Sequence, residues 1–103
     1  MENLNQVQWL EKIQNDSEAV ILDVRSPQEC AEGMQANAIQ MNIMNTAQFI
    51  ADINTLDKSK NYYVYCRSGG RSGQACMLMG AKGYITFNLN GGMLSWTGEV
   101  VMP

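Results

Sequence analysis

The sequence predicts an α/β fold in which helices pack on a central, mainly parallel sheet. Short runs of β-forming residues alternate with segments of helical character along the whole chain. The run AVILDV at 19–24 is almost continuously apolar, as strands buried in a parallel sheet are. The length of 103 residues suits one core, so we expect residues 1–103 to form a single domain.

The chain begins with a segment that predicts an amphipathic helix over residues 4–15. Apolar side chains recur there at near-helical spacing, namely Leu4, Val7, Leu10 and Ile13. Trp9 flanks this stripe. The first strand, 19–24, follows directly.

A second, short helix is expected to begin at Ser26. Ser26 is a favoured N-cap residue, Pro27 occupies the first helical position, and Glu29 completes a capping box. Gly33 is expected to end this helix. Three agreeing signals within four residues make this helix start well defined.

The middle of the chain predicts a second strand and a third helix. The segment 38–43 alternates between apolar and polar residues, as a half-buried strand does. Thr46 can cap a helix that runs to about Leu56. The buried face of that helix is expected to carry Phe49, Ile50 and Ile53.

The second half repeats the alternation of strand and helix. NYYVY at 61–65 is rich in β-forming residues and predicts the third strand. A helix is expected over 72–82, with Gly83 as its C-terminal cap. The segment 84–89 predicts a fourth strand, and 91–96 predicts a tight turn followed by one helical turn.

Composition and charge exclude several classes of function. The formal net charge of -3 indicates neither a nucleic-acid-binding nor a membrane-binding surface. The first ten residues lack the pattern of a secretory signal, and no apolar stretch approaches transmembrane length. A cytoplasmic, reducing location is therefore expected.

The cysteines and the missing histidine restrict the chemistry further. The three cysteines, at positions 30, 66 and 76, neither pair evenly nor follow a zinc-binding spacing, so we expect no metal and no cofactor. The chain contains no histidine, which excludes a Cys–His or Ser–His catalytic pair. A nucleophilic cysteine would need another means of activation. We interpret Cys30 and Cys76 as packing residues.

The stretch YVYCRSGGRSGQAC at 63–76 is the candidate site. Cys66 ends a predicted strand and precedes a helix, at the edge where ligands bind in parallel sheets. Ser68, Gly69 and Gly70 are small enough to let the backbone curl and turn its N–H groups inward. The following helix adds positive partial charge, so an anion cradle is expected around the sulfur.

This cradle favours the thiolate form of Cys66. Arg67 and Arg71 add positive charge within five residues, and cysteines in such surroundings have a lowered pKa. The hydroxyls of Ser68 and Ser72 are expected to donate hydrogen bonds to a bound anion; for Ser72, N-capping of the helix is the alternative. An inert, buried Cys66 is the contrasting interpretation.

Three chemistries suit a thiolate in an anion cradle. The thiolate could attack phosphorus as a phosphatase does, attack arsenate, or attack a sulfane sulfur and become a persulfide. A tetrahedral phosphoryl group needs room for three equatorial oxygens, whereas one terminal sulfur needs less. The size of the loop therefore bears on the choice.

Three motifs resemble those of the rhodanese (sulfurtransferase) family: ILDVRSPQE, YCRSGGRS and LNGGMLSW, in that order along the chain. The resemblance implies a parallel sheet, usually of five strands, with helices on both faces. Related phosphatases and arsenate reductases of this fold have five residues between cysteine and arginine. Here four residues, RSGG, separate Cys66 from Arg71, which favours sulfur transfer.

The resemblance also implies roles for individual residues. Cys66 would take a sulfur atom from a donor anion such as thiosulfate, hold it as a persulfide, and pass it to cyanide or a thiol, including a protein thiol. Arg71 would orient the anion, and Arg67 would favour thiosulfate over mercaptopyruvate. Asp23 and Arg25 match the family's D-x-R and would brace the loop, with a plain ion pair as the alternative. A non-catalytic sulfur-carrier or regulatory module is the non-enzymatic alternative.

One segment departs from the family's pattern. Where the family often reads GHIPGA, this chain reads GMQANA at 33–38. Asn37 tolerates the left-handed conformation, so the turn is expected to survive with an altered loop shape. The methionines are interpreted as core-filling residues, with a border of the cleft as the alternative for a few, and Trp96 is interpreted as a core anchor.

Overall fold

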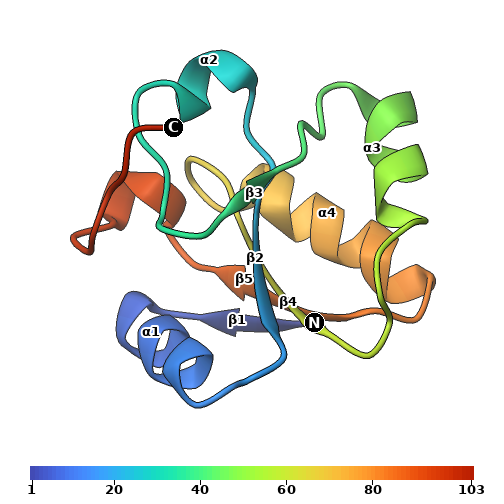
Figure 1. The fold of residues 1–103 in the computed structure, drawn as a ribbon, viewed down its shortest axis with the longest axis horizontal. Coiled ribbons are helices and arrows are strands. Elements are labelled where there is room, and N and C mark those ends of the chain that lie inside the picture. The colour runs from blue at the N-terminus through green and yellow to red at the C-terminus, as the bar shows by residue number, and fades with distance from the viewer.

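The computed structural model describes residues 1–103 and confirms the α/β class. Five strands form one all-parallel sheet in the order β1-β5-β4-β2-β3. The strands are β1 (Glu2–Leu4), β2 (Ala19–Asp23), β3 (Ile39–Gln40), β4 (Asn61–Tyr65) and β5 (Ile85–Leu89). Because β4 lies at the centre of the sheet, its carboxyl end is surrounded by other strand ends (Figure 1).

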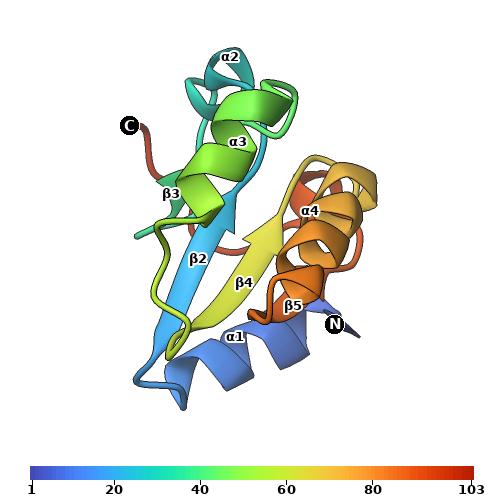
Figure 2. The ribbon, with the colours of Figure 1, turned by 90° about the vertical axis from the view of Figure 1, so that its right-hand side faces the viewer.

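Helices cover both faces of the sheet, as predicted. They are α1 (Gln6–Gln14), α2 (Pro27–Cys30), α3 (Thr46–Ile53), α4 (Gly70–Ala81) and the 3₁₀ turn η1 (Gly92–Ser95). Figures 1 and 2 show α1 on one side of the sheet and α3 and α4 on the other. In Figure 2 the arrow of β2 points toward α2, and the arrow of β4 points toward the loop that leads into α4.

Two cores form because successive side chains of β4 point to opposite faces. Tyr62 and Val64 pack in the larger core with residues of α3 and α4. Tyr63 and Tyr65 pack in the smaller core beside Trp9 of α1. All four β4 side chains are buried. None of the helices combines the length and apolarity that a membrane span requires.

β1 was not predicted, and the start and the buried face of the first helix were predicted incorrectly. Leu4 lies in β1, which pairs with β5, and α1 begins only after its N-cap Asn5. Within α1, Val7 is 72% exposed and Leu10 is 45% exposed, whereas Trp9 is fully buried. One large aromatic side chain therefore anchors the helix, and the regular apolar stripe does not.

The second helix confirms its capping signals but is shorter than predicted. Ser26 and Glu29 form the capping box, and Pro27 is the first helical residue. The helix ends at Cys30, before Gly33, which has a φ of +135° in the turn that follows. The strand predicted at 38–43 is reduced to the two residues of β3.

The third helix begins one residue earlier than predicted. Asn45, not Thr46, is the N-cap, and it makes no side-chain capping bond. The Thr46 hydroxyl instead donates to the Ile43 carbonyl. Phe49 and Ile53 are buried as predicted, and the helix ends at Ile53, ahead of Leu56.

The fourth helix begins two residues earlier than predicted. Its N-cap is Gly69, at a φ of +106°, so Ser72 lies inside the helix and does not cap it. The C-terminal prediction is confirmed: Gly83 adopts a φ of +92° and its N–H donates to the Gly80 carbonyl. The loop that follows Cys66 therefore leads directly into α4.

Candidate active site

Cys66 directly follows β4 and is fully buried at the carboxyl edge of the sheet. Its Sγ accepts a hydrogen bond from the Gly69 N–H at 3.1 Å. The Ser72 hydroxyl lies 3.3 Å from the same sulfur. Residues from the loop and from the first turn of α4 thus converge on one sulfur atom.

These contacts favour the thiolate. Burial by itself raises the pKa of Cys66 above its ordinary value of 9.0, but hydrogen bonds outweigh burial and lower the pKa. The bonds come from the Ser72 hydroxyl and from the backbone N–H groups of Ser72, Gly69 and Ser68. The loop's own dipoles therefore supply the activation that an imidazole supplies in other enzymes.

Asn88 is a site residue that the sequence analysis missed. Its Oδ1 lies 2.5 Å from the Ser72 hydroxyl, and its Nδ2 donates to the Gly69 carbonyl and to Asn3 Oδ1. The hydroxyl has one proton and two acceptors, the sulfur and the amide oxygen. Asn88 therefore influences how fully Ser72 donates to Cys66. An asparagine inside the otherwise β-forming run YITFNL was the only signal for this role.

The turn η1 supports the loop that follows Cys66 through backbone hydrogen bonds. The Met93 N–H donates to the Cys66 carbonyl at 3.0 Å, and the Leu94 N–H donates to the Arg67 carbonyl at 2.9 Å. Gly92 permits this approach: a Cβ there would lie 2.5 Å from the Cys66 carbonyl oxygen. Its φ of +51° also favours glycine. The motif LNGGMLSW therefore acts as a backbone support for the loop.

The arginines of the loop have different partners. Arg71 forms a two-pronged ion pair with Glu29 of α2, with N–O distances of 2.7 and 2.8 Å. The hydrogen bonds from Arg71 lower the pKa of Glu29 to about 2. Arg67 is exposed and takes part in none of the three ion pairs. Glu29, predicted only as a capping residue, thus also tethers the loop to α2.

Asp23 and Arg25 form a buried ion pair at the end of β2. Arg25 Nη2 lies 2.7 Å from Asp23 Oδ2 and donates to the Gly33 carbonyl at 2.7 Å. No hydrogen bond joins either side chain to residues 66–72. The pair therefore holds the turn at Gly33, and its predicted action on the catalytic loop stays a prediction.

The segment 33–38 is fastened to the core despite its unusual sequence. Asn37 adopts a φ of +67°, which confirms the left-handed conformation expected there. The Gln35 N–H donates to the Tyr65 hydroxyl, and Gln35 Oε1 accepts from Trp9 Nε1. The turn beside the site is thus connected through two buried side chains to α1 and β4.

The residues that the sequence analysis interpreted as packing residues differ in how deeply they are buried. Burial raises the pKa of Cys30 to about 12 and that of Cys76 to about 11, which fits packing residues held as thiols. Trp96 is half-buried against the smaller core. The core-filling interpretation is confirmed for the buried Met34 and Met79 and is wrong for Met44 and Met77, which are exposed. Met41 and Met93 are half-buried, and Met93 borders the cleft.

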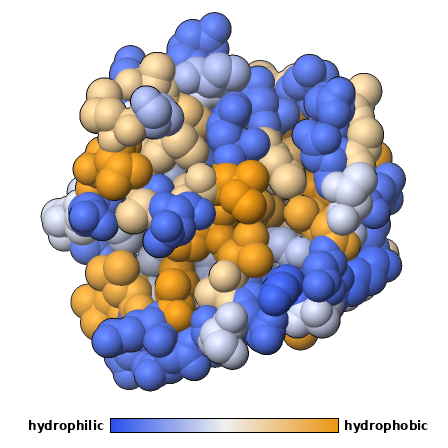
Figure 3. Space-filling view, in the orientation of Figure 1, coloured by the Kyte–Doolittle hydropathy of each residue, from blue (hydrophilic) through white to orange (hydrophobic).

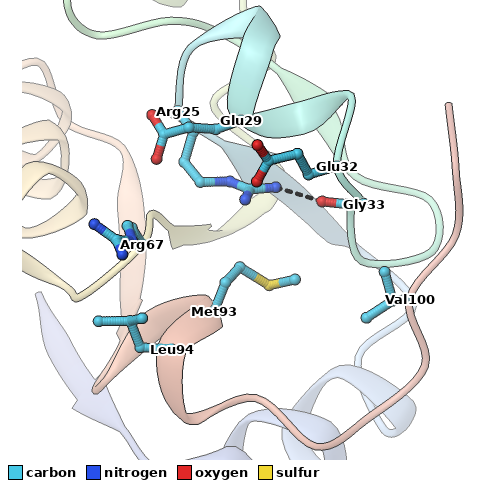
Figure 4. A pocket seen from close by; sticks show the side chains of 8 residues that line it. All are labelled: Arg25, Glu29, Glu32, Gly33, Arg67, Met93, Leu94 and Val100. Carbon is cyan, nitrogen blue, oxygen red and sulfur yellow. Dashed lines mark hydrogen bonds between the residues drawn. The ribbon is translucent and has the colours of Figure 1, made fainter.

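A cleft of about 560 Å³ opens beside the loop. Figure 4 shows the side chains that surround it, which come from α2 and its flanking residues, the loop after Cys66, η1 and the C-terminal segment: Arg25, Glu29, Glu32, Gly33, Arg67, Met93, Leu94 and Val100. One side is charged and the other is apolar. This arrangement can bind an anion near Arg67 and a less polar group against η1.

The fold and this site define a known class of domain. A model of the rhodanese-like domain family matches residues 6–99, and the chain belongs to that family. A rhodanese-like domain protein of Staphylococcus aureus has the same fold, with a TM-score of 0.86 and 26% identity over 100% of this chain and 99% of its own.

Three curated relatives are named as sulfurtransferases or as a tRNA hydroxylase. The chain is 40% identical to YtwF of Bacillus subtilis, a provisionally named sulfurtransferase, over 86% of this chain and 84% of YtwF. It is 32% identical to a sulfurtransferase of Allochromatium vinosum, over 84% and 78% of the two chains. It is also 29% identical to a tRNA uridine(34) hydroxylase of Pelagibacter ubique, over 82% of this chain and 29% of that protein.

Proposed function

We propose that this protein is a sulfurtransferase that carries a sulfane sulfur on Cys66. The observation that carries the proposal is the set of hydrogen bonds from Gly69 and Ser72 to Cys66 Sγ, which stabilise a thiolate without a histidine. The loop of four residues between Cys66 and Arg71 favours a single sulfur atom over a phosphoryl group. The two relatives named as sulfurtransferases support the same class of activity.

The proposed reaction has two displacement steps. The Cys66 thiolate attacks the outer sulfur of thiosulfate, the S–S bond of thiosulfate breaks, and sulfite leaves with the bonding electron pair. In the second step cyanide or a thiolate attacks the outer sulfur of the persulfide. Thiocyanate or an acceptor persulfide then leaves, and the Cys66 thiolate is restored. The covalently held sulfur makes a separate cofactor unnecessary.

The loop residues have distinct roles in this proposal. The N–H groups of Ser68 and Gly69 stabilise negative charge on the sulfur. Arg67 is the loop arginine without an ion-pair partner, so we assign to it the first contact with the donor anion. Arg71 is bonded to Glu29 and holds the loop against α2. To contact the donor anion as predicted, the Arg71 guanidinium must bind the anion and the Glu29 carboxylate at the same time.

Intact mass measurement tests the proposed function. Wild type incubated with thiosulfate is expected to gain one sulfur atom, which cyanide then removes as thiocyanate, while Cys66→Ser gains none. Absence of sulfur uptake from thiosulfate and other sulfane donors would contradict the proposal. Sulfur that loads but is released only slowly would indicate a carrier, and rapid hydrolysis of an aryl phosphate would indicate a phosphatase.

A further inference from the structure

The C-terminal strap, defined here as residues 100–102, lies beyond the segment that matches the family. Its Val101 forms an isolated antiparallel bridge with Met34. The Met34 N–H donates to the Val101 carbonyl and the Val101 N–H donates to the Met34 carbonyl, each at 2.8 Å. The strap is thus attached to the segment 33–38, where the sequence departs from the family's usual pattern.

The strap also forms one wall of the cleft. Figure 4 shows Val100 on the C-terminal segment, across the cleft from Arg67. Val100 packs against Gly33 so closely that a Cβ there would lie 2.5 Å from Val100 Cγ1. Gly33 in turn accepts the hydrogen bond from Arg25. The position of the strap is therefore set by two independent contacts with the same turn.

The strap is held by backbone hydrogen bonds, and its side chains are exposed and lie outside both cores. Val100 is 48% exposed, Val101 is 37% exposed and Met102 is 69% exposed. Figure 3 shows apolar surface in the middle of this face, where Figure 1 draws β3, with smaller areas toward η1 and α1. Removing the strap would cost little apolar burial, so its effect on access can be separated from its effect on folding.

The depth of Cys66 makes the width of the cleft important for the second step. Cys66 is fully buried, and a persulfide adds only one S–S bond, about 2 Å, beyond its Sγ. The cleft is lined by Arg67, the neighbour of Cys66, and the wall proposed below requires that an acceptor reach the sulfur through this cleft. A cleft of about 560 Å³ has the volume typical of small-molecule sites and is far smaller than a folded protein.

We propose that the strap is a specificity-determining wall, which admits small acceptors such as cyanide and low-molecular-weight thiols and excludes thiols on folded protein surfaces. The proposal rests on the proposed sulfur transfer for its acceptor class. Val100 is the residue that narrows the cleft, and Val101 positions it through the bridge to Met34.

Alkylation of Cys66 tests the wall without any sulfur chemistry. The rates with iodoacetamide and with a maleimide carrying a polyethylene glycol chain are compared, and modified Cys66 is identified by peptide mapping. Deletion of residues 100–103 and Val101→Pro, which removes the N–H bonded to Met34, are expected to raise the bulky-to-small rate ratio several-fold. Val101→Ala keeps that N–H and is expected to leave the ratio unchanged. An unchanged ratio in the deletion variant overturns the proposal.

Acceptor kinetics then test the specificity itself. Protein loaded with sulfur is mixed with cyanide, glutathione or a reduced folded protein that has one surface cysteine. The strap variants are expected to gain activity several-fold with the protein thiol alone, and equal gains with all three acceptors would contradict selection by size. Val100→Ala keeps the bridge and serves as the second variant if Val101→Pro lowers the thermal midpoint.

The two proposals fail in different ways. If wild type takes up no sulfur but the strap variants still raise the alkylation ratio, the sulfurtransferase proposal fails and the wall stands. Suppose that wild type loads and transfers sulfur, but the strap variants change neither the alkylation ratio nor the activity with the protein thiol relative to the small acceptors. The wall proposal then fails and the sulfurtransferase proposal stands.

Discussion

At the scale of single residues, hydrogen-bond donors lower the pKa of Cys66 more than the nearby arginines do. Four hydrogen-bond donors from Ser68, Gly69 and Ser72 offset the cost of burying a charged sulfur. The guanidinium of Arg71, the expected source of positive charge, is bonded to Glu29. The hydroxyl of Ser72 is the one side-chain donor to the sulfur, and so it is the residue whose removal is most informative.

Replacing Ser72 with alanine is expected to raise the pKa of Cys66. Because the pKa is lowered in the folded protein, the thiolate is present at lower pH than in a free cysteine, and sulfur loading rises with pH until it levels off above the pKa. In Ser72→Ala this rise should move to higher pH, and loading at neutral pH should be slower. Ultraviolet absorbance of the thiolate as a function of pH measures the change.

Ser68→Ala is the matched control for this prediction. Ser68 acts on the sulfur through its backbone N–H, which alanine retains, so the pH of half-ionisation should stay as in wild type. The assignment to Ser72 fails if both variants titrate like wild type, or if both shift equally.

At the scale of elements, two short segments, η1 and α2, hold the loop beside the first turn of α4. The 3₁₀ turn η1 donates two backbone hydrogen bonds to the carbonyls of Cys66 and Arg67. The short helix α2 supplies Glu29 to the loop. Both segments lie beyond the carboxyl ends of the parallel strands, where ligands bind in sheets of this type. Because both segments are short, η1 and α2 both fit around the loop that contains the sulfur.

Gly92→Ala is expected to damage both stability and sulfur loading. The added Cβ would collide with the Cys66 carbonyl, and alanine would have to adopt a φ of +51°, a conformation that costs about 1–3 kcal/mol. Urea unfolding and the rate of sulfur uptake measure the two effects. Gly80→Ala, in an exposed turn of α4 where a Cβ meets nothing within 4 Å, should instead be neutral or stabilising. Equal behaviour of the two variants would contradict a specific role for Gly92.

At the scale of the whole molecule, two cores on opposite faces of one sheet keep the strand ends in register. The smaller core depends on Trp9, which packs edge-on against Tyr63 and Tyr65 with ring centroids 5.5 and 6.2 Å apart. The indole N–H also bonds Gln35, whose backbone N–H bonds the Tyr65 hydroxyl. The same side chain therefore links the packing of α1 to the turn that borders the cleft.

Trp9→Ala is expected to lower the free energy of unfolding by about 3–5 kcal/mol, as large-to-small changes at buried aromatic residues do. Val7→Ala in the same helix should change it by less than about 0.5 kcal/mol, since Val7 is 72% exposed. Urea denaturation measures both changes in the free energy of unfolding. The slope of this free energy against urea concentration is compared between the variants. A large loss in Val7→Ala and a small one in Trp9→Ala would restore the apolar stripe as the anchor of α1.

The elements that could be predicted are those determined by local signals. The capping box at Ser26, the cap at Gly83 and the apolar strand at 19–24 each depend on residues that are neighbours in the chain. β1 could not be predicted because three residues carry no period, and its partner β5 lies more than eighty residues away. Thr46 was placed as a cap because propensity alone does not distinguish a capping residue from the first helical residue.

For the candidate site, Cys66 as the nucleophile and the length of its loop were predicted from one continuous stretch, and the need for activation without histidine was predicted from the composition. Three further features became visible in the tertiary structure: Glu29 pairs with Arg71, Asn88 hydrogen-bonds Ser72, and the strap borders the cleft. The physical reason is that each of these contacts joins segments distant in the chain. The packing of the sheet and its helices, not local propensity, brings them together.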